Sequence, residues 1–362
     1  MIGRRLAMLG VAFSLAACDA PAPKAPPSPK APAPVKLETK AAKSPTLEAV
    51  RRRGALVCGI HQGLPGFAFP NAAGRWQGFD VDICRAIAAA TLGDAEKVRF
   101  VTITAQDRFT ALQEGRIDVL SRNTSWTYSR DASLGLDFPV ITYFDGQGFL
   151  APRALKLSSA EELAGARICV LAGTASEANL ADFFRAHGLK VTPVRVGSED
   201  EARRLYQGDG CDAYTADISA LAAARSVLNN PGAHALLPDV ISKEPLGPVV
   251  RQNDPVWADI VRWTIYALVL AEEMGLTAHT ADQARETAVD PQTRRLLGVE
   301  GNLGALLGLP DDWAYQAIRQ VGAYHEIFQR DLGADSPLNL DRGLNALWNA
   351  PKPGLLYAPP MR

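Results

Sequence analysis

The same order of predicted strands and helices occurs twice along the chain, and this doubling restricts the fold more than any other sequence feature. Each unit runs strand, helix, strand, helix, strand; in the first helix Ile83, Ile87 and Ala90 recur on one face. Such alternation predicts an α/β fold with parallel, doubly wound sheets covered by helices. The five elements lie at 55–60, 82–93, 98–104, 107–114 and 117–121 in the first unit, and at 166–171, 176–187, 191–196, 199–206 and 211–215 in the second.

Two extended segments that contain glycine or proline cross between the units. One is 142–149 and the other is 241–250. We therefore expect two doubly wound lobes joined by a two-strand hinge, which together form a clamp. The expected boundaries are 46–145 with 246–310 for lobe 1, 146–245 for lobe 2, and 311–362 for a C-terminal extension. After the second crossing, the sequence predicts helices over 257–273 and 310–328 and an irregular tail from 347.

The N-terminus is typical of an exported lipoprotein. Residues 1–18 have an Arg pair, a short apolar run and a lipobox ending at Cys18, the predicted lipidation site. Residues 19–45 are rich in Ala, Pro and Lys and predict an extended linker without helix or strand. We expect a periplasmic protein tethered to a membrane by its lipid. The alternative for residues 1–18 is the start of a buried apolar helix with an incidental cysteine. The alternative for residues 19–45 is a disordered tail without a function.

Charge and motifs exclude several classes of function. The 38 basic and 39 acidic residues form no basic stripe, which argues against nucleic acid as a partner. No nucleophile elbow, zinc-protease motif, P-loop or dinucleotide-binding glycine motif occurs, and the five histidines lack the spacing of metal ligands. The sequence therefore predicts no catalytic residues, no metal and no cofactor.

A polar run after the strand at 117–121 is the candidate binding segment. Ligands of open α/β sheets bind at the carboxyl ends of strands. The run contains hydroxyls and an amide and ends at Arg130, whose planar guanidinium suits a carboxylate. In the second unit, Asp217 follows the equivalent strand and suits an ammonium group, while Thr174 lies in a hydroxyl-rich turn that begins a helix. These residues indicate capture of a zwitterion.

Several motifs resemble those of the periplasmic binding proteins of polar amino-acid ABC importers, the family 3 extracellular solute-binding proteins, and most closely the general L-amino-acid-binding group. The resemblance covers about residues 47–362 and implies the type II periplasmic binding protein fold. It also implies a free L-amino acid of acidic or broad range as the ligand, the permease of an importer as the partner, and a monomeric protein. The matching motifs are GFDVDICRA at 78–86, RNT at 122–124, YFDGQGF at 143–149, ISKEPLGP at 241–248 and YAPP at 357–360.

The resemblance also assigns roles to individual residues. Arg130 matches the arginine that grips the substrate α-carboxylate, with Ser125 beside it. Asn123 matches the position that meets the α-ammonium group, and Asp217 matches the acid that takes this group from the other lobe. Thr174 is the first of two threonines usual after a glycine here, but the second is Ala175 in this chain.

Two further positions concern the ligand side chain. Phe67 lies near the family's aromatic wall, and Arg108 matches a position that reaches the side-chain carboxylate in binders of acidic amino acids. His61 stands where other residues are usual, and we interpret it as a bystander. Phe67 as a plain core residue and Arg108 as an exposed residue at a helix start are open alternatives. So are Arg130 as a surface partner of a nearby aspartate and Asp217 as a helix cap alone.

Export to an oxidising compartment leaves four cysteines besides Cys18, which permit three pairings. Cys58 and Cys84 fall on the first strand and first helix of lobe 1. Cys169 and Cys211 fall on two strands of lobe 2 that are neighbours in the usual doubly wound order. We predict one disulfide in each lobe, 58–84 and 169–211.

Two other functions share this fold. An enzyme such as a dehydratase or a peptidoglycan lyase would need an acid–base pair, which is not evident, and a lyase would need more than the roughly 55 residues expected after the clamp. A sensory ectodomain would need a transmembrane helix and a cytoplasmic domain downstream, which the sequence does not indicate. We therefore predict a transport binding protein.

Overall fold

The computed structural model describes residues 43–362. The predicted signal, the lipobox with Cys18 and nearly all of the predicted linker lie outside the described residues. The last linker residue is helical, contrary to the expectation, because α1 (Pro45–Arg53) begins there. Proline is tolerated at this position since the first N–H groups of a helix lack intrahelical partners. Ser44 caps the helix by accepting a hydrogen bond from the Leu47 N–H, and its hydroxyl donates to Asp254.

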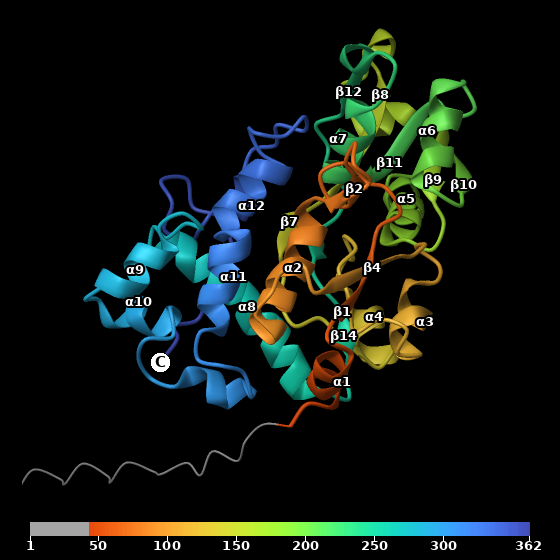
Figure 1. Cartoon of the computed structure of the whole chain (residues 1–362). Helices are drawn as coiled ribbons and strands as arrows, with labels where there is room; N and C mark the ends of the chain where they lie inside the picture. The colour runs from red at the N-terminus through yellow and green to blue at the C-terminus, as the bar shows by residue number, and fades with distance from the viewer. Residues whose placement is uncertain (1–42) are drawn as a thin grey trace, which may run out of the picture. The chain divides into compact units, whose positions relative to one another are not determined.

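Lobe 1 is built on a parallel sheet in the order β4-β1-β5 (Figure 1). Its strands are β1 (Leu56–Ile60), β4 (Val98–Thr102) and β5 (Val119–Leu120), and β1 pairs in parallel with both neighbours. Helix α2 (Phe79–Leu92) follows β1, and α3 (Arg108–Gln113) follows β4. The order strand, helix, strand, helix, strand is the one predicted. Smaller elements are β2 (Phe69–Pro70), β3 (Trp76–Gln77) and α4 (Tyr128–Ser133).

Lobe 2 contains a five-stranded sheet in the order β10-β9-β11-β8-β12. The predicted strands β9 (Arg167–Leu171), β10 (Thr192–Val196) and β11 (Ala213–Asp217) are parallel. Two strands not assigned to this sheet from the sequence, β8 (Gln147–Pro152) and β12 (His234–Leu236), extend it antiparallel, so the sheet is mixed. Its helices are α5 (Ala175–Ala186), α6 (Glu199–Gln207) and α7 (Ile218–Ser226).

A short antiparallel pair lies where the chain crosses between the lobes, since strand β7 (Tyr143–Asp145) pairs with β13 (Glu244–Leu246). A second pair, β6 (Leu136–Asp137) with β14 (Val250–Arg251), lies within lobe 1 beside β5. Gly247 follows β13, and a Cβ atom there would lie 2.2 Å from the Val140 carbonyl oxygen, so only glycine fits this approach. The observed fold is therefore α/β, with one main sheet in each lobe and a two-strand connection between them. The exact lobe boundaries stay a prediction.

The C-terminal helices cover lobe 1. Helix α8 (Pro255–Glu273) and α11 (Trp313–Val321) both pack against α2 (Figure 1). The helix predicted over 310–328 is two helices, because Gly322 adopts φ +108° between α11 and α12 (Tyr324–Asp331). The tail from 347 is irregular, as predicted. The remaining elements are α9 (Ala281–Thr287), α10 (Pro291–Leu296) and the 3₁₀ turns Arg153–Leu155, Ala160–Leu163, Pro231–Ala233, Leu303–Leu307 and Gly343–Asn345.

The C-terminal extension also contacts the hinge strand β7. The Asn345 side chain accepts a hydrogen bond from the Phe144 N–H at 2.6 Å and donates to the Phe144 carbonyl at 3.0 Å. The Tyr324 hydroxyl donates to the Thr142 carbonyl at 2.7 Å. A segment distant in sequence therefore fixes one of the two crossings.

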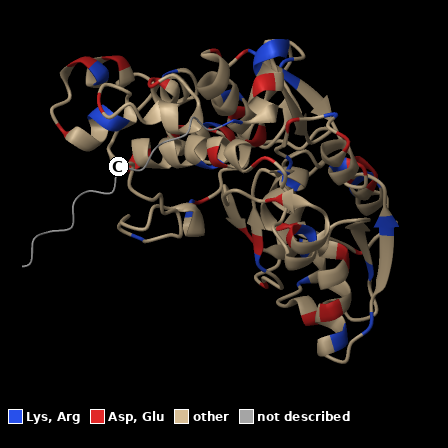
Figure 2. Ribbon diagram, turned by 90° about the horizontal axis from the view of Figure 1, so that it is seen from below, with Lys and Arg blue, Asp and Glu red and all other residues tan. Residues whose placement is uncertain are grey.

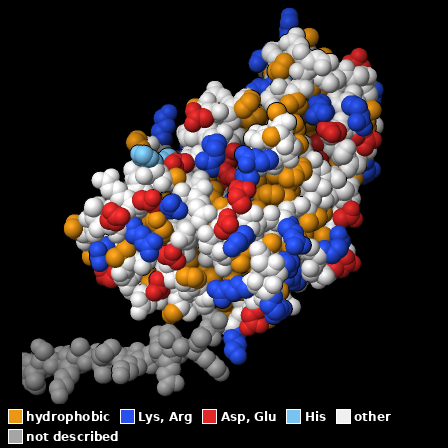
Figure 3. Space-filling view, in the orientation of Figure 1, with side chains coloured by type: hydrophobic (Ala, Val, Ile, Leu, Met, Phe, Trp, Pro, Cys, Tyr) orange, Lys and Arg blue, Asp and Glu red, His pale blue; other side chains and the backbone are white. Residues whose placement is uncertain are grey.

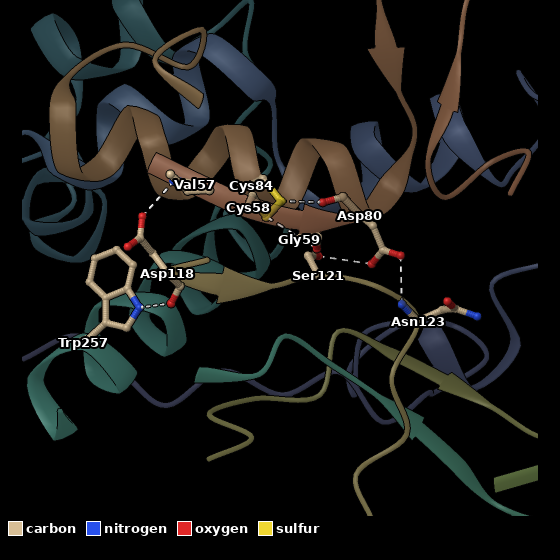
Figure 4. Close-up of a disulfide and its surroundings, with 9 residues drawn as sticks. All are labelled: Val57, Cys58, Gly59, Asp80, Cys84, Asp118, Ser121, Asn123 and Trp257. Carbon is tan, nitrogen blue, oxygen red and sulfur yellow. Dashed lines mark hydrogen bonds between the residues drawn. A yellow bond between two sulfur atoms is a disulfide. The ribbon is translucent and has the colours of Figure 1, made fainter. Parts of the chain in front are cut away.

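Both predicted disulfides are present. Cys58 joins Cys84, linking β1 to α2 with their Cα atoms 6.2 Å apart (Figure 4). Cys169 joins Cys211, linking β9 to the residues just before β11 with a Cα separation of 5.6 Å. All four side chains are buried. Each bridge therefore joins two segments of the same lobe.

Charged residues of both signs are mixed over the described part of the molecule. Lys, Arg, Asp and Glu alternate along the helices and loops in Figure 2, and blue and red groups are interspersed on the face in Figure 3. The faces drawn there therefore lack a field of one sign. None of the helices within 43–362 has both the length and the apolar character needed to span a bilayer.

Candidate functional site

One pocket lies between the two lobes, at the carboxyl ends of their parallel strands. It encloses about 500 Å³, its open mouth included, and is lined by three arginines and two carboxylates. Six of the predicted ligand residues line it; only Phe67 does not. The lining residues are Arg108, Arg122, Asn123, Ser125 and Arg130 from lobe 1, and Leu171, Thr174, Ala175, Ser176, Glu199, Tyr214, Thr215, Ala216, Asp217 and Ala220 from lobe 2.

The loop after β5 is held in place by Asp80 at the start of α2. The Asp80 carboxylate accepts hydrogen bonds from the Asn123 N–H at 2.9 Å and the Ser121 hydroxyl at 3.2 Å (Figure 4). Asn123 has φ +28°, a strained value for a residue with a side chain, so this bond fixes an otherwise unfavourable turn. Burial raises the pKa of Asp80 to about 6, although these hydrogen bonds and Arg122 oppose the rise.

Asn123 presents an unused acceptor to the pocket. Its side-chain oxygen Oδ1 is buried, and no hydrogen-bond partner is found for it among the described residues. A buried polar atom without a partner is costly, on the order of 1–3 kcal/mol. A ligand N–H group in the pocket would satisfy it.

Arg130 projects from the first turn of α4. Its Nη1 donates to the Ser125 carbonyl at 2.8 Å, and its guanidinium carbon lies 5.4 Å from the centre of the Phe109 ring. Burial lowers the pKa of Arg130, while Glu244 and Asp217 act to raise it. No ion pair joins Arg130 to a nearby aspartate in the described region, so the surface-pair alternative is wrong.

Asp217 faces this arginine from lobe 2. It occupies the N-cap position of α7, but its side chain makes no capping hydrogen bond, so the cap-only alternative is wrong. Burial raises its pKa well above the usual range, and the neighbouring carboxyls Asp145 and Glu244 add to the rise, whereas Arg130 and Arg108 oppose it. A cation in the pocket would compensate this buried carboxyl group.

Arg108 is buried, not exposed at a helix start as the alternative supposed. Its Nη1 donates to the Ala105 carbonyl in its own lobe, and its Nη2 donates to the Gly173 carbonyl of lobe 2 at 3.3 Å. The guanidinium carbon lies 4.5 Å from the Phe109 ring centre, and Nε is a buried donor without a partner among the described residues. Arg108 is therefore a buried cation with one N–H group that lacks a hydrogen-bond partner among the described residues.

Thr174 sits at the N-cap position of α5 on the lobe 2 wall. Its hydroxyl donates to the Leu171 carbonyl at 2.7 Å. Ala175, where the resemblance expected a second threonine, also lines the pocket and offers no hydroxyl. Lobe 2 therefore presents fewer hydroxyl donors than the resemblance implies.

Phe67 does not form a wall of the pocket. Its ring packs edge-on against Phe79 at 6.2 Å and Tyr143 at 5.9 Å, and only 1% of the residue is exposed. The expectation was wrong because the turn that contains Phe67 is hydrogen-bonded to the start of α2, where Asp80 N–H donates to the Phe67 carbonyl. Phe67 is therefore a residue of the hydrophobic core, as the alternative interpretation supposed.

Sequence reasoning missed a polar group that joins the lobes. His61, taken as a bystander, contacts Glu199 with Nε2 and Oε1 2.7 Å apart, and Arg122 Nη2 lies 3.7 Å from the same oxygen. Burial acts to raise the pKa of Glu199, but His61 and Arg122 outweigh it and hold the pKa at about 2. His61 follows β1 and Glu199 follows β10, so their position at strand ends was the available signal.

The titratable side chains include no group of three or more that could hold a metal ion within 43–362. The site instead pairs arginines from lobe 1 with carboxylates and backbone groups from lobe 2. Such an arrangement binds a small ion with charges of both signs.

Comparisons with known proteins agree with this geometry. The profile of the bacterial extracellular solute-binding proteins, family 3, matches residues 56–277. The chain is 50% identical over 326 residues to the glutamate/glutamine/aspartate/asparagine-binding protein BztA of Rhodobacter capsulatus, covering 90% of this chain and 96% of that protein. It is 50% identical over 324 residues to the general L-amino acid-binding periplasmic protein AapJ of Rhizobium johnstonii, covering 89% and 94%.

A solved structure is similar over nearly the same range. An ABC transporter periplasmic binding protein from Brucella ovis with glutathione bound has a TM-score of 0.85 and 50% sequence identity, covering 88% of this chain and 99% of that one. The predicted type II periplasmic binding protein fold is confirmed, and these relatives are binding proteins, not enzymes. The chain belongs to family 3 of the bacterial extracellular solute-binding proteins.

Proposed function

We propose that this protein captures free L-amino acids in the periplasm and delivers them to the permease of an ABC importer. The observation that carries the proposal is the half-buried Arg130 and the buried Asp217, which line one pocket from opposite lobes. A free amino acid bears a carboxylate and an ammonium group on one carbon, so a binder that accepts many side chains must hold those two groups.

In this proposal the ligand backbone has four contacts. Arg130 and Ser125 bind the α-carboxylate, with the guanidinium already oriented by the Ser125 carbonyl. Asp217 and the free Asn123 Oδ1 bind the α-ammonium group. Micromolar affinity requires about −8 kcal/mol, and leaving one buried charge unpaired costs on the order of 2–5 kcal/mol. The two charged contacts therefore carry most of the affinity.

The side-chain end of the pocket favours acidic and amide ligands. Arg108 supplies a buried cation with an unused donor, and Arg122 lies beside it. The names of the relatives include glutamate, glutamine, aspartate and asparagine. The Brucella ovis structure contains glutathione, whose γ-glutamyl end also has a free α-amino acid group. Thr174 lies close enough in the pocket wall to contribute a hydroxyl.

We further propose that the mature chain is a monomeric lipoprotein held at a membrane through Cys18, with residues 19–44 as linker. The lobe boundaries 46–145 with 246–310, and 146–245, belong to this proposal. Metabolic labelling with a palmitate analogue tests the lipid, and Cys18→Ala should abolish incorporation. Labelling that survives the substitution would contradict the assignment.

A ligand screen tests the central function. The chain from Asp19 onward is heated with each of the twenty L-amino acids and with glutathione at 1 mM, and the matching D-amino acids serve as controls. A ligand at 100 times its Kd stabilises the folded state by about 2.7 kcal/mol. We expect glutamate, glutamine, aspartate and asparagine to raise the Tm by several degrees and their D-enantiomers to have smaller effects. No rise with any L-amino acid would contradict the proposal.

A further inference from the structure

His61 contacts Glu199, a residue that lines the pocket, and so bridges the lobes. It follows β1 in lobe 1, and its imidazole is 2% exposed. Glu199 is the first residue of α6 in lobe 2 and lines the pocket. Their 2.7 Å contact joins residues 138 positions apart in sequence. This contact exists only while the lobes are together, since each partner belongs to a different lobe.

The backbone around His61 fixes the protonation of the ring. The Gly63 N–H donates to His61 Nδ1 at 3.0 Å, so Nδ1 is an acceptor and carries no proton. The ring hydrogen is therefore on Nε2, which donates to Glu199 Oε1. The imidazole is neutral in this arrangement. A second proton would have to be placed on Nδ1, directly against the Gly63 N–H.

The charged groups around the imidazole come from both lobes. Burial lowers the pKa of His61, and Arg122 on the loop after β5 lowers it further. Glu199 and Asp200, both at the start of α6, act in the opposite direction. The carboxylate of Glu199 is shared with Arg122, 3.7 Å away, which weakens its pull on a second proton. Geometry and charge thus agree on a neutral ring when the lobes are closed.

We propose that His61 is a positioning residue that makes ligand binding depend on pH, because the closed lobes accept only the neutral imidazole between Gly63 and Glu199. The proposal rests on the proposed function, in which a ligand is held between closed lobes. When the lobes separate, the imidazole loses Glu199 and meets water, so it can take a proton. Acid therefore favours the open lobes and weakens binding.

The size of the effect follows from linkage. A histidine in water has a pKa of about 6.5, and closure prevents it from taking a proton. The open form is then stabilised by protonation as the pH falls below about 6.5. Between pH 7.5 and pH 5.5, affinity should fall by up to about tenfold from this residue alone.

The test measures the affinity for L-glutamine, whose own charges do not change in this range, by calorimetry at pH 5.5, 6.5 and 7.5. His61→Gln retains a neutral donor at every pH, and His279→Gln replaces an exposed histidine as the matched control. Burial raises the pKa of Asp80 and of Asp145 to about 6, so both also titrate in this window. These carboxyls are present in all three proteins, so the difference between the variants isolates His61.

We expect the wild type and His279→Gln to lose affinity toward pH 5.5 by a factor several times larger than His61→Gln does. Equal losses in all three proteins would overturn the proposal. Failure of the proposed function gives a different result, namely no heat with L-glutamine, L-glutamate or glutathione at pH 7.5.

NMR measures the same difference between the open and the closed lobes. The His61 signal, assigned by its absence in His61→Gln, should titrate near 6.5 in the ligand-free protein and clearly below 6.5 with saturating L-glutamine. A His61 pKa that saturating L-glutamine leaves unchanged would also overturn the proposal.

Discussion

The contact between Asn345 and the hinge strand gives a prediction that can be worked from the structure. Asn345 is 3% exposed, and its amide group pairs with both the N–H and the carbonyl of Phe144, 201 residues earlier. The register partner of Phe144 on β13 is Pro245, which has no N–H to donate. The Asn345 amide therefore makes, on the edge of β7, the two backbone hydrogen bonds that a neighbouring strand would otherwise make.

Truncation to alanine leaves two backbone groups of Phe144 without partners. Each unsatisfied buried group costs about 1–3 kcal/mol, and Phe144 is half-buried, so water relieves part of the cost. We expect Asn345→Ala to lower the free energy of unfolding by about 2–4 kcal/mol. Asn345→Asp should cost at least as much, because a carboxylate accepts from the N–H but meets the carbonyl with a second acceptor.

Urea denaturation followed by circular dichroism measures this change as a shift of the midpoint. Asn349→Ala, an exposed asparagine of the same C-terminal segment, is the matched control and should change the free energy of unfolding by less than about 0.5 kcal/mol. The reasoning is refuted if Asn345→Ala is no less stable than Asn349→Ala. An unchanged Asn345→Asp would show that donation to the Phe144 carbonyl contributes nothing.

Three further predictions concern the pocket and the core. Arg108→Ala should weaken glutamate and aspartate binding at least tenfold more than glutamine and asparagine binding in calorimetry; equal losses would contradict its role. The double substitution Cys169→Ala and Cys211→Ala should lower the free energy of unfolding, measured in urea, by up to about 4 kcal/mol, because the disulfide closes a loop between cysteines 42 residues apart. A loss below about 1 kcal/mol would contradict this contribution of the disulfide. Burial raises the pKa of Asp80 to about 6, so the folded state binds more protons than the unfolded state between pH 3.8 and 6, and stability falls as pH rises through that range. Asp80→Asn should flatten this fall in denaturation curves, and an unchanged slope would contradict it.

Local patterns and the usual strand order were sufficient for the five elements of each repeated unit and for both disulfides. Apolar spacing placed the strands and helices of each unit, and the usual order of doubly wound strands brought Cys169 and Cys211 together. The same reasoning placed Arg130 and Asp217 at strand ends that meet at one pocket. These features depend on periodicity and on topology, which are both readable from a single sequence.

Contacts between distant segments were not predictable in this way. The orientation of Phe67 depends on packing with Tyr143, and the addition of β8 and β12 to the lobe 2 sheet depends on hairpin-like returns that carry no clear pattern. The partners of His61 and of Asn345 lie 138 and 201 residues away. No local propensity encodes such pairs, and each becomes evident only when the lobes and the C-terminal extension are packed.

Binding of L-glutamate and L-glutamine to Arg130→Ala and Asp217→Ala, measured by calorimetry at pH 7.5, tests the central claim most directly. Arg99→Ala and Asp341→Asn, which change exposed charges away from the pocket, are the matched controls. Loss of one buried charge pair costs on the order of 2–5 kcal/mol, so each pocket variant should bind at least about thirtyfold more weakly than its control while melting at a similar temperature. Wild-type affinity in both pocket variants would contradict the clamp.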